Sequence, residues 1–296
     1  MNHASPLALL DALISGLVLG GMYALVALGL NLQYGVARIL NLAYGEILVA
    51  GAVFAWAAYT SYGVAPPFAL IALVPLAALI GLAIYRVVLT PLVKRARTRA
   101  ALETDSLLAT FGLLFVVQGV MLVAVGGGYL TYSYLAIPVD LLGSRVAANR
   151  LLALGFALAL GAALYLLLAR TRVGTAIRGL AVDPTAALVV GIDVRKLAGW
   201  TFAIGTVLAA LAGVLVSMFL TISATMGVVF TMKALIVVIM GGVGNLAGGV
   251  VAALLLGLAE SLVATFVDPA LTLAANYALF VAVLLVRPAG LFGRSA

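Results

Sequence analysis

The sequence of 296 residues contains no cysteine, one histidine (His3) and only 8% charged residues. Without cysteine, a disulfide framework or a thiolate metal site is excluded. The single histidine is the third residue of the chain, so the sequence offers no plausible set of catalytic residues around a histidine. Soluble domains carry roughly 25% charged residues, so water cannot be the main solvent of this chain. We therefore expect no metal site, no bound cofactor and no enzymatic reaction carried out by the chain itself.

Apolar residues make up 66% of the chain and form long runs without charge. These runs cover residues 12–37, 47–85, 106–139, 197–232 and 234–259. A membrane-spanning helix needs about 20 apolar residues, so several runs accommodate two crossings. The runs are continuously apolar, whereas the strands of a membrane β-barrel alternate apolar with polar residues. The sequence predicts an all-α polytopic membrane protein, a bundle of about eight or nine transmembrane helices in one domain over residues 1–296.

The net charge of +7 comes from basic residues that gather in alternate loops. Five of the 16 Lys and Arg residues fall within 86–99, five within 170–196, and Arg287 and Arg294 come near the last residue. This pattern is typical of cytoplasmic loops, so the basic charge sets orientation in a lipid bilayer and does not indicate nucleic acid. We expect loops 91–99 and 170–196 and the C-terminus in the cytoplasm. Residues 1–6 show no features of a removable signal peptide.

The turn residues divide the chain into expected crossings at 7–30, 47–62, 68–89, 107–125, 151–169, 197–220, 246–266 and 271–286. Residues 232–240 are too short for an ordinary span and end at a glycine-rich stretch, 241–244. No lysine follows these glycines as a phosphate-binding loop requires, so we expect no ATP site in this chain.

Polar residues interrupt the apolar sequence between the first two expected crossings. We predict that Gln33, Asn41, Tyr44 and Glu46 line the substrate pathway, because an ionisable residue within a membrane is costly and is usually functional. Lys233 is expected to reach the interface with its long side chain, and the role of Glu260 stays open. The pattern N-L-A-x-G occurs at both Asn41 and Asn245, which fits either an internal repeat or chance.

A short cytoplasmic helix is predicted between the fifth and sixth expected crossings. Asp183 is a typical N-cap residue, Pro184 suits the first helical position and Gly191 is a natural stop. Its mostly apolar residues must be buried against something. Arg172 and Arg178 suit either an anionic bilayer surface or a groove on a soluble partner.

Three blocks together resemble the membrane permeases of branched-chain amino acid ABC importers. The blocks are Gly20-Gly-Met-Tyr-Ala-Leu-Val-Ala-Leu-Gly29 with Tyr34-Gly35 and Asn41-Leu-Ala-Tyr-Gly-Glu46; Arg172-Val-Gly-Thr-Ala-Ile-Arg178 with Ala186-Ala187-Leu188 and Gly191-Ile192; and Lys233 to Gly249 with the ending Arg287-Pro-Ala-Gly-Leu-Phe-Gly293. The chain is most similar to the permease type that ends soon after this last motif. Tyr44 is a departure, since relatives commonly have His or Gln there.

The resemblance implies a subunit of an ATP-driven importer in the bacterial inner membrane. Its partners would be a second, homologous permease, two cytoplasmic ATPases that bind ATP and Mg, and an extracytoplasmic solute-binding protein. The segment at about 172–194 would be the coupling helix. The residues assigned to ATPase coupling are Arg172, Arg178, Asp183, Ala186, Ala187, Gly191 and Ile192.

The expected function is alternating-access import of amino acids, branched-chain ones first, or of a related solute such as urea, an amide or an aromatic acid. An ion-coupled secondary transporter is the alternative. Such a protein would keep coupling-ion ligands near the middle of the membrane. A channel or structural membrane subunit, which needs no coupling helix, is a third possibility.

Overall fold

The structure is a computed structural model that describes residues 6–96, 98–141 and 144–293. Outside these ranges lie residues 1–5, which include His3 and most of the segment considered for a signal peptide, as well as Arg97 and Arg294. The helices are α1 (Pro6–Leu32) with the π-helical turn η1 (Gln33–Ala37), α2 (Tyr44–Tyr62), α3 (Pro66–Ile84) with the π-helical turn η2 (Tyr85–Leu89), α4 (Thr90–Arg95), α5 (Arg99–Val125), α6 (Ala148–Arg170), α7 (Arg172–Val182), α8 (Pro184–Val189), α9 (Val194–Ser217), α10 (Gly227–Gly241), α11 (Leu246–Phe266), the 3-10 turn η3 (Pro269–Leu271) and α12 (Thr272–Val286).

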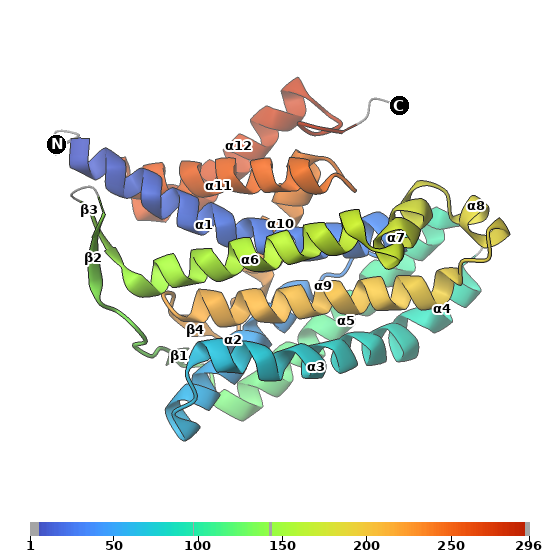
Figure 1. Cartoon of the computed structure of the whole chain (residues 1–296), viewed down its shortest axis with the longest axis horizontal. Coiled ribbons are helices and arrows are strands. Elements are labelled where there is room, and N and C mark those ends of the chain that lie inside the picture. The colour runs from blue at the N-terminus through green and yellow to red at the C-terminus, as the bar shows by residue number, and fades with distance from the viewer. Residues whose placement is uncertain (1–5, 97, 142–143, 294–296) are drawn as a thin grey trace.

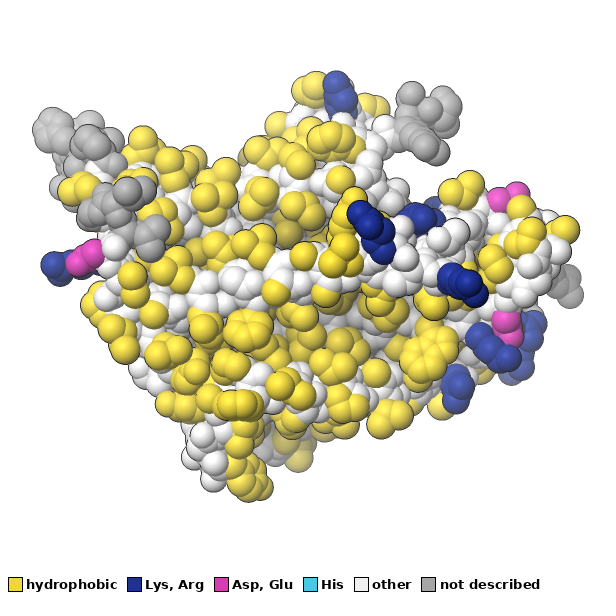
Figure 2. Space-filling model, in the orientation of Figure 1, with side chains coloured by type: hydrophobic (Ala, Val, Ile, Leu, Met, Phe, Trp, Pro, Cys, Tyr) yellow, Lys and Arg dark blue, Asp and Glu magenta, His cyan; other side chains and the backbone are white. Residues whose placement is uncertain are grey.

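The long helices lie along the long axis of the molecule and connect two different ends (Figure 1). One end, called the strand end, carries the antiparallel pairs β1 (Tyr129–Leu130) with β4 (Ile222–Ser223) and β2 (Pro138–Leu141) with β3 (Ser144–Ala147). The other, called the basic end, carries α4, α7 and α8, and dark-blue Lys and Arg side chains gather there (Figure 2). The space between the ends is covered by apolar side chains.

Seven of the described helical segments are long and apolar enough to cross a membrane. Two more helices, α2 and α10, cross only part of the bundle, because α2 begins with buried polar residues and α10 has 15 residues. The prediction of an all-α polytopic membrane protein is confirmed. The predicted number was about eight or nine crossings, whereas seven described segments meet these criteria and α2 and α10 do not.

Helix α9 forms the centre of the bundle and contacts α1, α2 and α3. Of its most apolar stretch, 83% is buried within the chain, against 6% for α12 and 17% for α5. The outer helices therefore present apolar faces to lipid or to another membrane subunit, while α1 and α9 are surrounded by protein.

Glycines allow the closest approaches between helices. A Cβ added at Gly20 would lie 2.8 Å from the Cα of Leu254, so α1 and α11 touch backbone to backbone. Gly213 on α9 and Gly51 on α2 each face a carbonyl oxygen of the other helix, Leu48 O and Ala210 O, in the same way. Small residues at helix contacts are a main source of stability in membranes, where helices gain little from hydrophobic burial.

The structure differs from the sequence predictions at several places. The predicted loop at 91–99 contains most of α4, and α5 begins at Arg99 rather than near 107. There are three further differences. First, α1 continues through Asn31 into η1, so the break covers only residues 38–43. Second, the loop at 126–150 contains the hairpin β2–β3. Third, the basic segment after α6 contains an additional helix, α7, before the predicted one.

Candidate functional site

The chain breaks inside the bundle between η1 and α2. Arg38 ends η1 with a φ of 55°, a left-handed conformation that reverses the chain direction. Helix α2 then begins at Tyr44, which is fully buried, and thus starts within the bundle. Helix α10 likewise begins at a buried residue, Gly227, and packs against α2.

Gln33 and Asn41 form one buried polar cluster across this break. Asn41 Nδ2 donates to Gln33 Oε1 over 3.1 Å, and Gln33 Nε2 donates to the carbonyl oxygen of Phe202 over 2.9 Å. Both side chains are fully buried, and their donors bond to one another and to α9 rather than to solvent. Asn41 Oδ1 is buried without a hydrogen-bond partner among the described residues. The cluster holds the end of η1 against the centre of the bundle.

Tyr44 and Glu46 belong to the first turn of α2 but point to different neighbours. The Tyr44 hydroxyl donates to the carbonyl oxygen of Val26 over 2.8 Å. Glu46 lies against the start of α10, where a Cβ on Gly227 would overlap its carboxyl group. Both Glu46 oxygens are buried without a hydrogen-bond partner among the described residues. A buried carboxyl group in this state is costly and therefore marks a candidate functional position.

A hydrogen bond from the backbone of α2 to a side chain of α10 also links these two helices. The N–H of Gly45 donates to Thr231 Oγ1 over 2.8 Å, so α10 supports the first turn of α2. The structure thus brings the four predicted pathway residues to the break and its neighbouring helices, with Gln33 and Asn41 in contact. It does not gather all four in one cavity.

Lys233 does not reach the interface, so that sequence prediction was wrong. Its Nζ lies 2.8 Å from Glu260 Oε1, and the two side chains are only 12% and 14% exposed. The Tyr23 hydroxyl accepts from Lys233 Nζ over 2.6 Å, and Asn276 Nδ2 donates to Glu260 Oε2 over 2.8 Å. This ion-pair cluster joins α1, α10, α11 and α12. Sequence reasoning missed the pairing because its members lie up to 253 positions apart, from 23 to 276.

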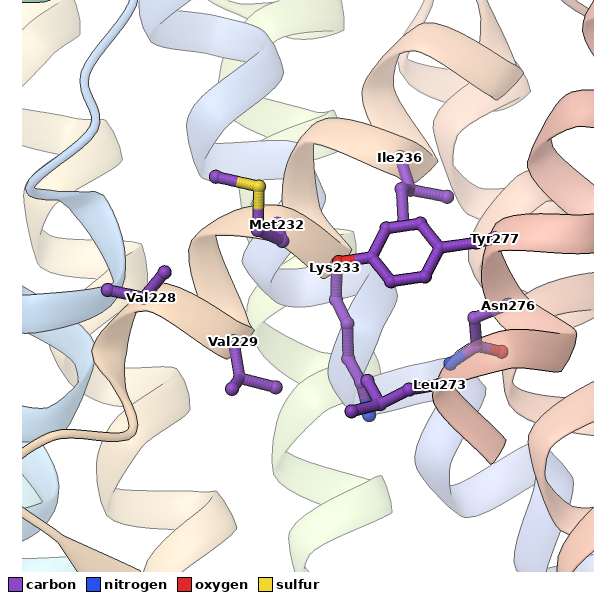
Figure 3. Close-up of a pocket in the computed structure, with 8 residues that line it drawn as sticks. All are labelled: Val228, Val229, Met232, Lys233, Ile236, Leu273, Asn276 and Tyr277. Atoms are coloured by element: carbon purple, nitrogen blue, oxygen red, sulfur yellow. The ribbon is translucent and has the colours of Figure 1, made fainter. Parts of the chain in front are cut away.

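A cavity of about 110 Å³ adjoins this cluster between α10 and α12 (Figure 3). Lys233 and Asn276 contribute its polar wall, and the close-up shows the ring of Tyr277 reaching from α12 toward α10. The remaining lining is apolar and consists of Val228, Val229, Met232, Ile236 and Leu273. None of the four predicted pathway residues lines it.

The segment predicted to couple to a partner forms α7 and α8 at the basic end. Asp183 Oδ1 accepts from the N–H groups of Thr185 and Ala186 over 2.8 and 3.1 Å, as expected of an N-cap. Pro184 is the first residue of α8, and Gly191 follows with a φ of 81°, as predicted. The N–H of Ile192 closes the turn by donating to the carbonyl oxygen of Ala187 over 3.0 Å.

The exposed surface of this segment differs from the predicted one. Ala187 is only 4% exposed and packs into the core, while Ala186 faces outward. Val173 and Val182 are exposed on α7, and the apolar side chains exposed in α8 and directly after it are those of Leu188, Val189 and Val190, at 60%, 84% and 73%. We call these three the α8 patch. Arg172 is exposed at the start of α7, whereas Arg178, also exposed, donates to the carbonyl oxygen of Leu168 and thereby ties α7 to α6.

The two N-L-A-x-G stretches have different local roles. Asn245 is the N-cap of α11, since its Oδ1 accepts from the N–H of Gly248 over 2.9 Å. Asn41 makes no cap, because α2 has no side-chain cap and Asn41 bonds to Gln33 instead. The matching letters therefore do not produce matching structures.

Comparison with known proteins gives one consistent result. The family described as branched-chain amino acid transport system, permease component, matches residues 12–286. The high-affinity branched-chain amino acid transport system permease protein LivH of Salmonella typhimurium is 29% identical over 300 residues, covering 96% of each chain. BraD of Pseudomonas aeruginosa, which carries the same description, is 28% identical with the same coverage. A probable LivH permease of Methanocaldococcus jannaschii is 25% identical, covering 94% of this chain and 90% of the relative.

The order of the long helices, the interrupted start of α2 and the capped segment at the basic end all fall within the matched residues. This chain belongs to the family of permease components of branched-chain amino acid transport systems.

Proposed function

We propose that this chain is one of two permease subunits of an ATP-driven importer that carries branched-chain amino acids or a closely related small solute. The observation that supports this most is the family match over residues 12–286, together with relatives whose names specify branched-chain amino acid transport. The proposed complex also contains two ATPases that bind ATP and Mg, and an extracytoplasmic solute-binding protein. The chain itself would be inserted in the inner membrane with its basic end and C-terminus in the cytoplasm.

The α8 patch is the proposed contact with an ATPase. An exposed apolar patch at the basic end, where α7 also exposes Arg172 and Arg178, fits a groove on a cytoplasmic protein. Movement of an ATPase would pull on α7 and α8 and, through their short links, on α6 and α9. Because α9 packs against α1, α2 and α3, a tilt of α9 would also shift these three helices.

The proposed substrate pathway passes the starts of α2 and α10. Interrupted helices near the middle of a transporter commonly mark the path, because they expose backbone groups and permit movement. Gln33, Asn41, Tyr44 and Glu46 all lie at this interruption. Glu46 is the residue that we expect to respond to the passing solute, since its carboxyl group has no partner in this conformation.

The test is uptake by the assembled complex in proteoliposomes. The chain would be produced together with the ATPases, the second permease and the binding protein encoded beside it, and loaded with ATP on the ATPase side. We expect radioactive leucine to accumulate only when ATP and the binding protein are both supplied. Accumulation driven by an ion gradient without ATP would contradict the proposal and support a secondary transporter.

A further inference from the structure

The ion-pair cluster is unusual because it places two full charges inside the apolar part of the bundle. Lys233 and Glu260 lie on α10 and α11, between the basic end and the strand end. The cost of removing both charges from water roughly offsets their mutual attraction, and apolar residues of similar volume often stabilise a fold equally well. Packing alone therefore does not require charges here, and intramembrane charges commonly belong to a functional site.

Asn276 adds a second observation that points to a ligand. It is 1% exposed and lines the cavity between α10 and α12. Its Nδ2 donates to Glu260, but its Oδ1 is buried with no hydrogen-bond partner among the described residues. The Glu260 carboxylate already accepts from Lys233, Tyr23 and Asn276. Among the described residues of the cluster, the amide oxygen of Asn276 is therefore the acceptor that is left without a donor.

The cavity supplies an apolar compartment directly beside these groups. Val229, Met232 and Ile236 line it from α10, and Leu273 lines it from α12. Figure 3 shows the Lys233 side chain between α10 and α12, with the nitrogen of Asn276 turned toward it and the oxygen of Asn276 turned away. Val228, Leu273 and Tyr277 are 38%, 44% and 47% exposed, so the cavity opens to the outside of the chain.

These features are the chemical complement of one class of solute. We propose that the Lys233–Glu260 pair, Asn276 and the cavity between α10 and α12 form a binding site for a zwitterionic amino acid with a small aliphatic side chain. The solute carboxylate would bind Lys233, its ammonium would bind Glu260, and its side chain would enter the cavity. The Asn276 amide would have to turn over for its Oδ1 to accept from the solute ammonium as well. One internal ion pair would be exchanged for two, so no charge would be left unpaired.

The position of the site agrees with the proposed pathway, on which this inference rests. Val228 and Val229 follow Gly227, the residue against which Glu46 packs. The first turn of α10 therefore contacts the helix break on one side and the cavity on the other. A solute bound at the ion pair would lie one to two turns of α10 from Glu46.

The first test separates binding from a purely structural role of the charges. In the double variant K233M/E260M, two apolar side chains of similar length replace the pair. A structural pair would tolerate this change, and the complex would transport leucine with unchanged KM. We expect the variant to assemble with its partners but to lose leucine uptake by at least about tenfold, since the groups that bind the solute are gone. Unchanged uptake would overturn the proposal.

The second test does not depend on the folding of that variant. Val229→Phe fills the cavity, and Ile239→Phe adds the same ring on α10 at an exposed position outside it. One methylene in an apolar site changes kcat/KM by about 10-fold to 200-fold. We expect V229F to lower kcat/KM for leucine at least tenfold more than for alanine, and I239F to leave this ratio unchanged. Equal ratios in the two variants would refute the site, whereas wild-type complex without ATP-dependent amino acid uptake would refute the proposed function instead.

Discussion

Replacing one valine of the α8 patch should separate ATPase docking from folding. Val189 is 84% exposed at the end of α8, and Ala187, two positions earlier, is only 4% exposed. An aspartate at position 189 would enter the proposed interface without disturbing the chain itself. An aspartate at position 187 would place a carboxylate in the core. The two variants therefore introduce the same carboxylate into opposite environments.

The magnitudes follow from burial. Full burial of a valine side chain is worth about 1.5–3 kcal/mol, and a carboxylate in an apolar groove adds a desolvation cost. We expect V189D to weaken ATPase binding by about 2–4 kcal/mol, roughly 30-fold to 700-fold in Kd. Its effect on the stability of the isolated permease should stay within about 0.5 kcal/mol, as for other exposed positions. A187D buries an unpaired charge, which destabilises the fold by several kcal/mol, whereas the total free energy of unfolding is about 5–15 kcal/mol.

Two measurements on the co-expressed complex check this reasoning. Co-purification reports ATPase binding, and thermal unfolding of the permease in detergent reports its stability. V189D should keep its Tm and lose the ATPases, while A187D should fail to yield folded permease. Tyr62→Asp, at a residue 83% exposed at the strand end, is the matched control and should keep the ATPases. Full ATPase binding and coupled uptake by V189D would refute the assignment of the patch.

Three further outcomes follow from the packing and the helix caps. Gly213→Val should prevent folding, because its Cβ would overlap Leu48 O, whereas Gly112→Ala, where no atom lies within 4 Å, should leave the Tm unchanged on thermal unfolding in detergent. Asn245→Ala should cost about 1–2 kcal/mol in the same assay, since it removes the N-cap of α11 as well as the bond to Phe292 O. At Asp193, the N-cap of α9, hydrogen bonds from the backbone N–H and the ammonium of Lys196 lower the carboxyl pKa. The stabilisation by Asp193 should therefore be present above its unfolded pKa of about 3.9 and be lost as the pH falls through the lower folded value, so D193A should lower the Tm at pH 7 but not at pH 2.

Local signals in the sequence predicted local structure well. The cap of α8 at Asp183, its first residue Pro184 and its end before Gly191 all depend on groups within a few positions of one another. The long apolar runs likewise predicted the spans, because a membrane helix must satisfy its own backbone.

Pairings between distant segments could not be predicted. Asn31 looked like the start of an interruption, yet α1 continues past it because Asn31 Oδ1 accepts from Gly244 N–H and its Nδ2 donates to Asn245 O. Lys233 was expected at the interface because it lies near an expected outside end and has a long side chain. Its partners Glu260, on the next helix, and Tyr23, on the first, could not be recognised from the sequence. The sequence therefore indicated the polar interruption that contains Glu46, but it did not indicate that Lys233, Glu260, Tyr23 and Asn276 form one cluster.

The backbone contacts of Gly20 with Leu254 and of Gly213 with Leu48 also restrict how this family can diverge. When two side chains pack against each other, a substitution at one position can be compensated by a substitution at the other. A glycine that packs against the backbone of another helix cannot be compensated in this way, because no single substitution elsewhere moves a peptide group. We expect these positions to stay fixed among distant members, while the outer residues of α12, which touch few others, are free to vary. Sequence variation among family members should thus be greatest in the outer helices and smallest in α9.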